Sequence, residues 1–267
     1  MGPMDGFATR AALLAAGLAL AAGPAAAQAP PAKPGARVEA APRTPDGKPN
    51  LNGIWQVFGA SDWNIEPHSA EDGRPAGMGI VVGGEIPYQP GALEQRRKNY
   101  ANRLTADPLA RCFLPGVPRA TYLPFPFEII QTPKHIGIAH EYAHATRTIF
   151  LDGTPPLSDL EFWMGDSRGR WEKDTLVIDT ISLNGQAWLD HAGNFYSEAA
   201  RLTERLTPRG PNHIDYEVTI DDPKVFTRPW QMRMVLYRRL EANLELLEYE
   251  CVEHFYLKLL EQRKEKR

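Results

Sequence analysis

The feature that most constrains the fold is a succession of short segments of alternating apolar and polar residues, separated by turn residues, in the second half of the chain. Such period-two segments are typical of strands that bury one face. Because the connections are short, consecutive segments are expected to pair as antiparallel neighbours. The pattern predicts a mainly β fold, with nine such segments: Phe127–Thr132, His135–Tyr142, Thr146–Leu151, Glu161–Met164, Thr175–Leu183, Arg201–Thr207, His213–Asp221, Trp230–Tyr237 and Leu246–Val252.

A further strand is expected at Gly53-Ile-Trp55, a G-x-W sequence similar to the one with which lipocalins enter their barrel. A meander of this many strands would leave exposed edges unless the sheet closed on itself. We therefore expect residues 44–267 to form one domain, an antiparallel up-and-down barrel of lipocalin-like or calycin-like form. One internal helix is expected over residues 91–104, started by Pro90. A C-terminal helix is expected over residues 253–262.

The N-terminus has the pattern of an export signal. Arg10 precedes a small, apolar run from Ala11 to Ala22, and three alanines end at Ala27 as in an A-x-A cleavage site. This predicts a signal peptide over residues 1–27 and a periplasmic or secreted protein with no stable membrane anchor after cleavage. The alternative, a transmembrane anchor, is disfavoured because the run is short and rich in alanine. Residues 28–43 are rich in proline and alanine, which predicts a flexible leader.

Composition excludes several classes of function. The formal net charge of −3 provides no basic surplus to neutralise phosphates, so nucleic acid is not an expected partner. The chain has no phosphate-binding glycine loop, dinucleotide fingerprint, zinc-type cysteine pair or calcium loop, so neither a cofactor nor a metal is expected. Its two cysteines, Cys112 and Cys251, would be free to form a disulfide in an oxidising compartment. Two buried free thiols are the alternative.

Two motifs suggest catalysis but have the wrong context. His140-Glu-Tyr-Ala-His144 matches the H-E-x-x-H pattern of zinc peptidases, which needs both histidines on one helical turn. The flanking segments predict a hairpin instead, where the two histidines would stand about 13 Å apart on one face. Gly165-Asp-Ser167 is similar to the nucleophile block of one class of serine esterases. Residues 168–171 continue toward another strand rather than a helix, so a turn with solvated arginines is expected.

Period-two alternation assigns charged residues to faces of the sheet. In the segment 213–221 the four apolar residues share one face, which places His213 on the surface. By the same rule Glu204 lies with Leu202 and Leu206 on an apolar face. A buried carboxylate costs several kcal/mol unless it is paired or opens onto a pocket. Arg147 is a natural partner for it, or for Glu141, and either a structural ion pair or a ligand-binding role would explain the arrangement.

The loop from Trp188 to Glu198 combines polar and aromatic residues between two predicted strands. A histidine beside an acid, as in Asp190-His191, can act as a general base, and Tyr196 could donate to a developing oxyanion. Loops on a rigid barrel are where sites tend to lie. The alternative is that Asp190 and Asn194 cap the loop backbone while the aromatic residues plug one end of the barrel.

A set of short sequence blocks is spread along the chain: Thr44–Pro49 with Gly53–Trp55, Arg111–Arg119, Trp163–Asp166, Gly169–Glu172, Asp174–Asp179, Trp188–Asp190, Ala192–Phe195, Glu204-Arg205, Asp221–Trp230 and Leu247–Val252. In these blocks the chain resembles a family of exported bacterial proteins for which no activity is established. The resemblance covers nearly all of the chain after the leader. Members of that family tend to carry histidine at the position of Tyr196 and aspartate at that of Glu198. The resemblance thus implies that a candidate catalytic histidine is replaced here, or that His191 takes over its role.

Two functions follow from these observations. The first is a periplasmic barrel that binds a small apolar or aromatic molecule in its lumen, through Trp55, Trp163, Trp188, Trp230, His140 and Arg147. The alternative is a cofactor-free isomerase, lyase or hydrolase on the same scaffold, with acid–base catalysis by Asp190, His191, Tyr196 and Glu204. A third class, an envelope scaffold without a ligand, predicts no enclosed pocket.

Overall fold

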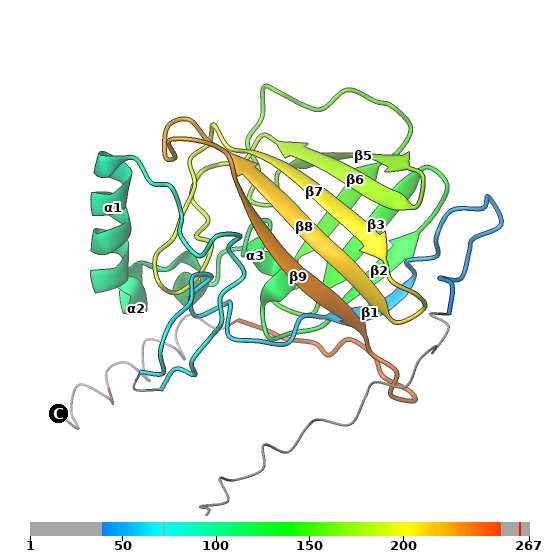
Figure 1. Cartoon of the computed structure of the whole chain (residues 1–267), viewed down its shortest axis with the longest axis horizontal. Coiled ribbons are helices and arrows are strands. Elements are labelled where there is room, and N and C mark those ends of the chain that lie inside the picture. Colours follow the sequence, from blue (N-terminus) through cyan, green and yellow to red (C-terminus); the bar gives the residue numbers. More distant parts are fainter. Residues whose placement is uncertain (1–38, 72, 252–261, 263–267) are drawn as a thin grey trace, which may run out of the picture. The chain divides into compact units, whose positions relative to one another are not determined.

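The computed structural model describes residues 39–71, 73–251 and 262, which form a closed barrel with short helices beside it (Figure 1). The expectation of a mainly β barrel is confirmed. The barrel strands are β1 (Gly53–Gln56), β2 (Phe127–Gln131), β3 (His135–His140), β4 (Thr146–Phe150), β5 (Asp166–Glu172), β6 (Thr175–Ile181), β7 (Arg201–Pro208), β8 (His213–Asp221) and β9 (Trp230–Arg238). The helices are α1 (Pro90–Ala101), α2 (Arg103–Ala106), the 3-10 helix η1 (Pro108–Arg111) and α3 (Arg119–Tyr122).

The strands pair in sequence order, and β9 closes the barrel on β1, with Trp55 opposite Arg238. Every pair is antiparallel except β4 and β5, which run parallel with Ile149 opposite Ser167. The barrel is therefore mixed, and not the wholly antiparallel up-and-down meander that the short connections predicted. The cause is the connection over residues 151–165, which brings the chain back to the end of the barrel where β4 began before β5 starts.

The strand that follows this connection is not the expected one. Residues 161–164 form no strand, whereas β5 runs through the segment expected to be a turn with solvated arginines. Gly169 allows this, because a Cβ there would lie 2.6 Å from a methyl carbon of Leu151. Arg168 donates to the carbonyl of Thr154 (2.7 Å), so the long connection holds its guanidinium.

The predicted last strand is also absent. Within residues 246–251 the only strand-like pairing described is one bridge between Tyr249 and Tyr142, so nine strands close the barrel. The predicted C-terminal helix over 253–262 lies outside the described residues except for Gln262. The predicted internal helix is α1, which starts at Pro90 as expected and ends at Ala101. None of the helices in the described ranges has the length and apolar character needed to cross a membrane.

The two ends of the barrel are built differently. The antiparallel pairing places β2–β3, β5–β6 and β7–β8 turns at one end, where all three are short. The other end carries the connections over residues 57–126 and 182–200, and the first of these contains α1, α2, η1 and α3. We call residues 57–65, 90–122 and 184–196 the cap. In Figure 1 α1 and α2 lie beside the barrel at the left, and α3 lies closer to the strands.

The alternation inferred from the sequence is present in the strands. In β8 the residues Ile214, Tyr216, Val218 and Ile220 are buried, while His213 is exposed as predicted. Leu202, Glu204 and Leu206 are likewise buried together in β7. Trp55 is buried where β1 meets β9, and the guanidinium of Arg238 lies 4.2 Å from the centre of its ring. This contact joins the first and last strands.

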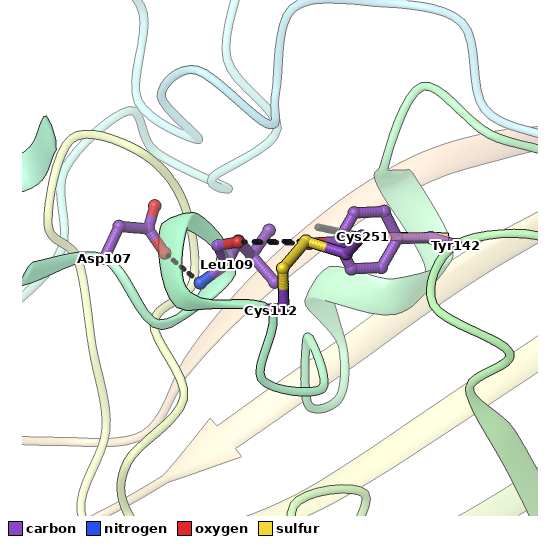
Figure 2. The surroundings of a disulfide bond; sticks show 5 residues. All are labelled: Asp107, Leu109, Cys112, Tyr142 and Cys251. Atoms are coloured by element: carbon purple, nitrogen blue, oxygen red, sulfur yellow. Dashed lines mark hydrogen bonds between the residues drawn. A yellow bond between two sulfur atoms is a disulfide. The ribbon is translucent and has the colours of Figure 1, made fainter. Parts of the chain in front are cut away.

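The two cysteines form a disulfide, which was one of the two expected outcomes (Figure 2). Cys112 follows η1 with a left-handed backbone (φ 60°), and its Cα lies 5.4 Å from that of Cys251. Tyr142 lies beside the bond, and its hydroxyl donates to the carbonyl of Leu109 (3.3 Å). The ring of Tyr249 packs on Tyr142 with centroids 5.3 Å apart. The disulfide thus attaches the C-terminal segment to the cap, rather than to a last strand.

Candidate functional site

The barrel interior contains a buried ion pair between Arg147 of β4 and Glu204 of β7. Two hydrogen bonds join their side chains, one of them from Nη1 to Oε1 at 2.9 Å. Arg147 also donates from Nε to the Ser167 hydroxyl (2.9 Å), and the Tyr216 hydroxyl donates to Glu204 (2.7 Å). Burial acts to lower the pKa of Arg147, but Glu204 outweighs it and the net direction is upward. The predicted pairing of these two residues is confirmed.

The interior around this pair is filled by side chains. Only 1% of Trp55, 3% of Trp230 and 1% of Glu204 is exposed, so a water-sized molecule can touch almost none of their surface. His140, at the end of β3, is also buried and packs against Phe127 with ring centroids 5.4 Å apart. Burial, reinforced by the positive charge of Arg147, lowers its pKa to about 3. The interior is a packed core beside these residues, not an open lumen.

The H-E-x-x-H segment forms the hairpin that its context predicted. His140 ends β3 and is buried, whereas His144 lies in the turn with a left-handed backbone and is exposed. His144 instead contacts Glu250, with Nε2 and Oε1 2.9 Å apart. Within the described residues, the ligand atoms of His144, Glu248 and Glu250 lie within 4.8 Å of one another, and these exposed groups could hold a metal ion.

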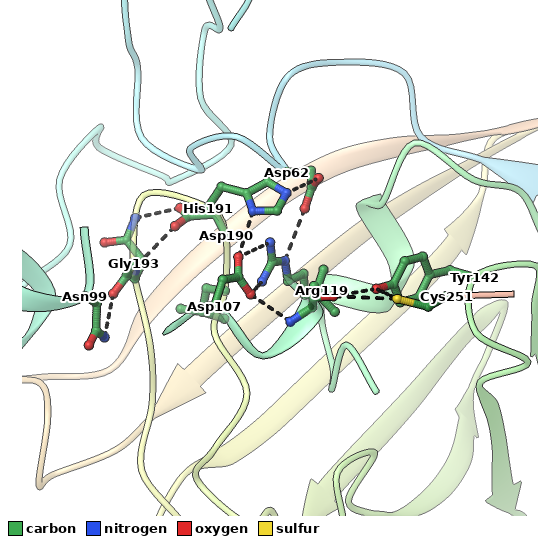
Figure 3. Close-up of polar contacts among 12 residues, drawn as sticks. Asp62, Asn99, Asp107, Arg119, Tyr142, Asp190, His191, Gly193 and Cys251 are labelled. Carbon is green, nitrogen blue, oxygen red and sulfur yellow. Dashed lines mark hydrogen bonds and ion pairs between the residues drawn. The ribbon is translucent and has the colours of Figure 1, made fainter. Parts of the chain in front are cut away.

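A second buried charge cluster lies in the cap and joins four segments (Figure 3). Arg119 of α3 donates to both oxygens of Asp107, at 2.9 and 3.0 Å, and from Nε to Asp62 at 3.1 Å. His191 completes the cluster, with Nδ1 2.7 Å from Asp107 and Nε2 3.1 Å from Asp62. The ring of Trp63 covers His191 at 5.1 Å between centroids. Each ring nitrogen of His191 is therefore within hydrogen-bonding distance of a carboxylate.

The charges of this cluster hold one another in place. Burial acts to raise the pKa of Asp107, but Arg119 and His191 outweigh it and hold that pKa well below its usual range. Burial acts to lower the pKa of His191, but Asp62 and Asp107 raise it to about 9. At neutral pH His191 is thus an imidazolium that donates from both nitrogens. Its side chain is 29% exposed, against 1% for Arg119.

Asp190 is adjacent to His191 in sequence, but its carboxylate forms hydrogen bonds with other residues. It accepts from the backbone nitrogens of Ile65 (2.9 Å) and Asn194 (3.1 Å) and from the Asn194 side chain (2.6 Å). Burial raises its pKa to about 6. Asp190 thus caps the loop backbone, which was the alternative expectation. The acids that orient His191 are Asp62 and Asp107, which the sequence reasoning missed.

One signal for the missed cluster is present in the sequence. Arg119 is the only charged residue in the run from Cys112 to Phe127, which is otherwise apolar and rich in proline. A lone charge in such a run predicts burial and therefore a partner of opposite sign. Asp107, which precedes Pro108 and caps η1 through the backbone nitrogen of Leu109 (3.0 Å), is that partner.

Tyr196 lies apart from His191. Its hydroxyl is buried near Gly116, where a Cβ would lie 2.8 Å from it, and it has no hydrogen-bond partner within the described part of the chain. Burial raises its pKa, and the charge of Arg147 opposes that shift. The four predicted catalytic residues are therefore not assembled in one site. Glu204 lies in the barrel interior, Asp190 and His191 contact different groups in the cap, and Tyr196, the last residue of the cap, is buried away from them.

Residues of the cap, together with Trp163 of the 151–165 connection, line a pocket of about 420 Å³, which we call the cap pocket. Trp163 and Phe113 form one wall, stacked with centroids 5.0 Å apart and planes 13° apart. Trp188 and Phe195 pair through a β-bridge in the loop opposite. The structure thus brings together two of the four predicted tryptophans, Trp163 and Trp188. The full lining is Gln95, Asn99, Ala106, Pro108, Arg111, Phe113, Trp163, Gly185, Gln186, Trp188 and Phe195.

The pocket walls are held together by close backbone contacts. Asn99 of α1 donates to the carbonyl of Gly193 (3.1 Å), and a Cβ on Gly193 would lie 2.7 Å from that of Asn99. Gly193 has a left-handed backbone (φ +82°), which favours glycine. Arg96 donates to Asn194 in the same loop (3.3 Å). Helix α1, which is polar in sequence, is thus positioned against the loop by hydrogen bonds.

A comparison of the chain with models of known protein families finds no match, and a comparison with curated proteins finds none either.

Proposed function

We propose that this protein is an exported binding protein for a small aromatic or apolar molecule, and that the molecule binds in the cap pocket. The observation that carries the proposal is the set of four aromatic side chains, Phe113, Trp163, Trp188 and Phe195, around a volume of about 420 Å³. This volume is within the range of about 300–1,000 Å³ of pockets for small ligands, which combine apolar walls with a few polar groups. Here Gln95, Asn99, Gln186 and Arg111 are the polar groups.

The position of the pocket supports a binding role. It lies on connections at one end of a closed barrel, and loops on a rigid scaffold are where binding residues concentrate. A lipocalin-like relationship is part of the proposal, supported by the closed barrel and by Gly53-Ile-Trp55 on its first strand. Export is supported by the signal-like N-terminus and by the disulfide, which persists in oxidising compartments.

The alternative of an acid–base enzyme has weaker support from the geometry. A general base needs a free nitrogen or oxygen within reach of a substrate. Both nitrogens of His191 face carboxylates, and Glu204 is paired with Arg147 inside the barrel core. His191 and Glu204, two of the residues expected to catalyse, are thus already engaged in ion pairs.

The test is calorimetric titration of the full-length mature protein with naphthalene-sized aromatic compounds, guided by mass spectrometry of molecules that co-purify with it. Trp163→Ala and Phe113→Ala are each expected to weaken binding about 10-fold, because each removes a stacked ring from the wall. Trp171→Ala is the matched control, since Trp171 is a partly buried tryptophan of β5 outside the pocket. Absence of binding, or equal losses in all three variants, would refute the proposal.

A further inference from the structure

An imidazole and two carboxylates converge where the C-terminal segment lies beside the turn between β3 and β4. His144 belongs to that turn, whereas Glu248 and Glu250 come from a segment much later in the chain. The ligand atoms of the three side chains all lie within 4.8 Å of one another. We propose that these three residues bind a zinc ion, which ties the C-terminal segment to the barrel. The site shares no residue with the cap pocket and does not depend on the proposed function.

The two carboxylates of this cluster carry more negative charge than the protein balances there. Glu250 has His144 as its ion-pair partner, with Oε1 and Nε2 2.9 Å apart. Glu248 has no hydrogen-bond or ion-pair partner within the described part of the chain. Residues 241–250 contain four glutamates and no lysine or arginine. Even a charged imidazole at His144 balances only one of the two carboxylates, so their proximity favours a bound cation.

The backbone on both sides of the cluster is held in place by other contacts. Tyr249, which lies between the two glutamates, forms a β-bridge with Tyr142, and their ring centroids are 5.3 Å apart. Cys251, two residues later, is bound to Cys112 of the cap (Figure 2). Alternate residues of an extended chain point to the same side, so the bridge presents both glutamates together beside His144. Ligands that are positioned in advance lose little conformational freedom when a metal binds.

The donor atoms select zinc over calcium and magnesium. Zinc binds imidazole nitrogen and carboxylate oxygen at about 2.0–2.2 Å, whereas calcium and magnesium take oxygen ligands. Ligand atoms around a tetrahedral zinc ion are about 3.3–3.5 Å apart, as these bond lengths require. The atoms of the cluster, which lie within 4.8 Å of one another, thus need to move by about 1 Å or less on average. All three side chains are exposed, so rotation of their outer bonds can close this gap.

The experiment is calorimetric titration of the full-length mature protein, without an affinity tag, with Zn²⁺ near neutral pH. We expect one zinc ion per chain. His144→Asn, Glu248→Gln and Glu250→Gln should each weaken binding at least about 10-fold, because each removes a ligand. Asparagine tolerates the left-handed backbone of His144 (φ 51°), so the first variant keeps the turn. His213→Gln is the matched control, since His213 is an exposed histidine of β8 outside the cluster, and it should bind zinc as the unchanged protein does.

Thermal unfolding gives a second readout. The Tm of the unchanged protein should rise with zinc concentration, because the metal binds only the folded state, and the Tm of Glu248→Gln should not. Calcium or magnesium at about 100-fold excess should not displace the zinc. Absence of zinc binding, undiminished binding in the three ligand variants, or displacement by calcium would overturn this inference. None of these results bears on the aromatic ligand of the cap pocket.

Discussion

The barrel and the cap each bury an arginine, but the positive charge is balanced by acids that are positioned in different ways. Arg147 of β4 faces Glu204 of β7 in the barrel interior, with β5 and β6 between their strands in the barrel order, and both side chains are buried. Arg119 faces Asp107 and Asp62, which come from separate loops, and the cluster extends to a histidine that reaches the surface. The strands of the barrel thus fix the positions of its charged residues. In the cap, by contrast, the ion pairs themselves hold irregular segments together.

Because of this difference, the two regions should differ in how their stability depends on pH. In the barrel core, burial lowers the pKa of His140 to about 3, so its ring is neutral near pH 7, and the pKa of Tyr216 is raised by burial and by Glu204. The cap contains an imidazolium whose charge is needed to balance two buried carboxylates. We therefore expect the stability of the barrel to depend mainly on packing, and the stability of the cap to depend on charge and pH.

The largest expected effect is the loss of Arg119. Arg119→Met leaves Asp107 and Asp62 buried with only His191 to balance them, so we expect the free energy of unfolding to fall by about 3–5 kcal/mol. Urea denaturation followed by circular dichroism measures it. A loss below about 1 kcal/mol would contradict this account of the cluster.

Double variants sharpen the comparison. Replacing both members of the barrel pair, Arg147→Met with Glu204→Leu, should recover much of the loss of Arg147→Met alone, because no unpaired charge remains. Arg119→Met with Asp107→Leu should recover less, since Asp62 stays buried. If both double variants regained the same share of the lost free energy of unfolding, the two clusters would not differ in the way proposed here.

The next effect is a loss of stability at alkaline pH. The pKa of His191 is raised from its ordinary value to about 9 in the folded protein. A raised pKa gives stability that is fully present below the unfolded pKa of about 6.5 and is lost as pH rises through about 9, by about 3 kcal/mol in all. Urea denaturation at about pH 7 and pH 10 measures this loss. His191→Gln should remove most of it, and an unchanged loss in that variant would assign the effect to another group.

Removal of the disulfide should separate the cap from the barrel. Replacing both Cys112 and Cys251 with serine is expected to lower the free energy of unfolding by about 2–4 kcal/mol. Amide hydrogen exchange should accelerate in η1, where the nitrogen of Cys112 donates to the carbonyl of Leu109, more than in β8. Uniform acceleration in both regions would show that cap and barrel unfold as one unit.

The smallest effect concerns two glycines. Gly193→Ala introduces a Cβ 2.7 Å from that of Asn99 at a left-handed backbone position, so we expect a loss of about 2 kcal/mol. Gly137→Ala in β3 meets nothing closer than 4.0 Å, and a change below about 0.5 kcal/mol is expected. Thermal unfolding of the two variants checks this. Equal shifts would mean that the contact between α1 and the loop does not constrain the cap.

The barrel was predictable from the sequence because its strands follow a local rule. Period-two alternation placed Glu204 on a buried face and His213 on the surface, and a buried carboxylate required a partner such as Arg147. The parallel entry of β5 was not predictable in this way. Arg168 and Gly169 have turn-like chemistry, and the segment forms a strand through its pairing with β6 and the close packing of Gly169 on Ile149 and Leu151.

The cap was predictable only in part. Trp163 and Trp188 were candidates as aromatic residues, but nothing local separated them from Trp55 and Trp230, which the barrel buries. Asp190 and His191 suggested a pair because they are adjacent. The Asp190 carboxylate accepts from the backbone of Ile65, whereas the His191 ring contacts Asp107, and these partners come from segments far away in the sequence. Such contacts depend on tertiary packing, which no periodicity encodes.

The central claim is that the ligand binds at the cap and not within the barrel. Anomalous diffraction from a crystal of this protein soaked with 6-bromo-2-naphthoate tests it most directly. We expect one bromine peak in the pocket, within contact distance of Trp163 and Phe113. A peak inside the barrel beside Trp55 or Trp230, or no ordered bromine at the cap, would contradict the claim.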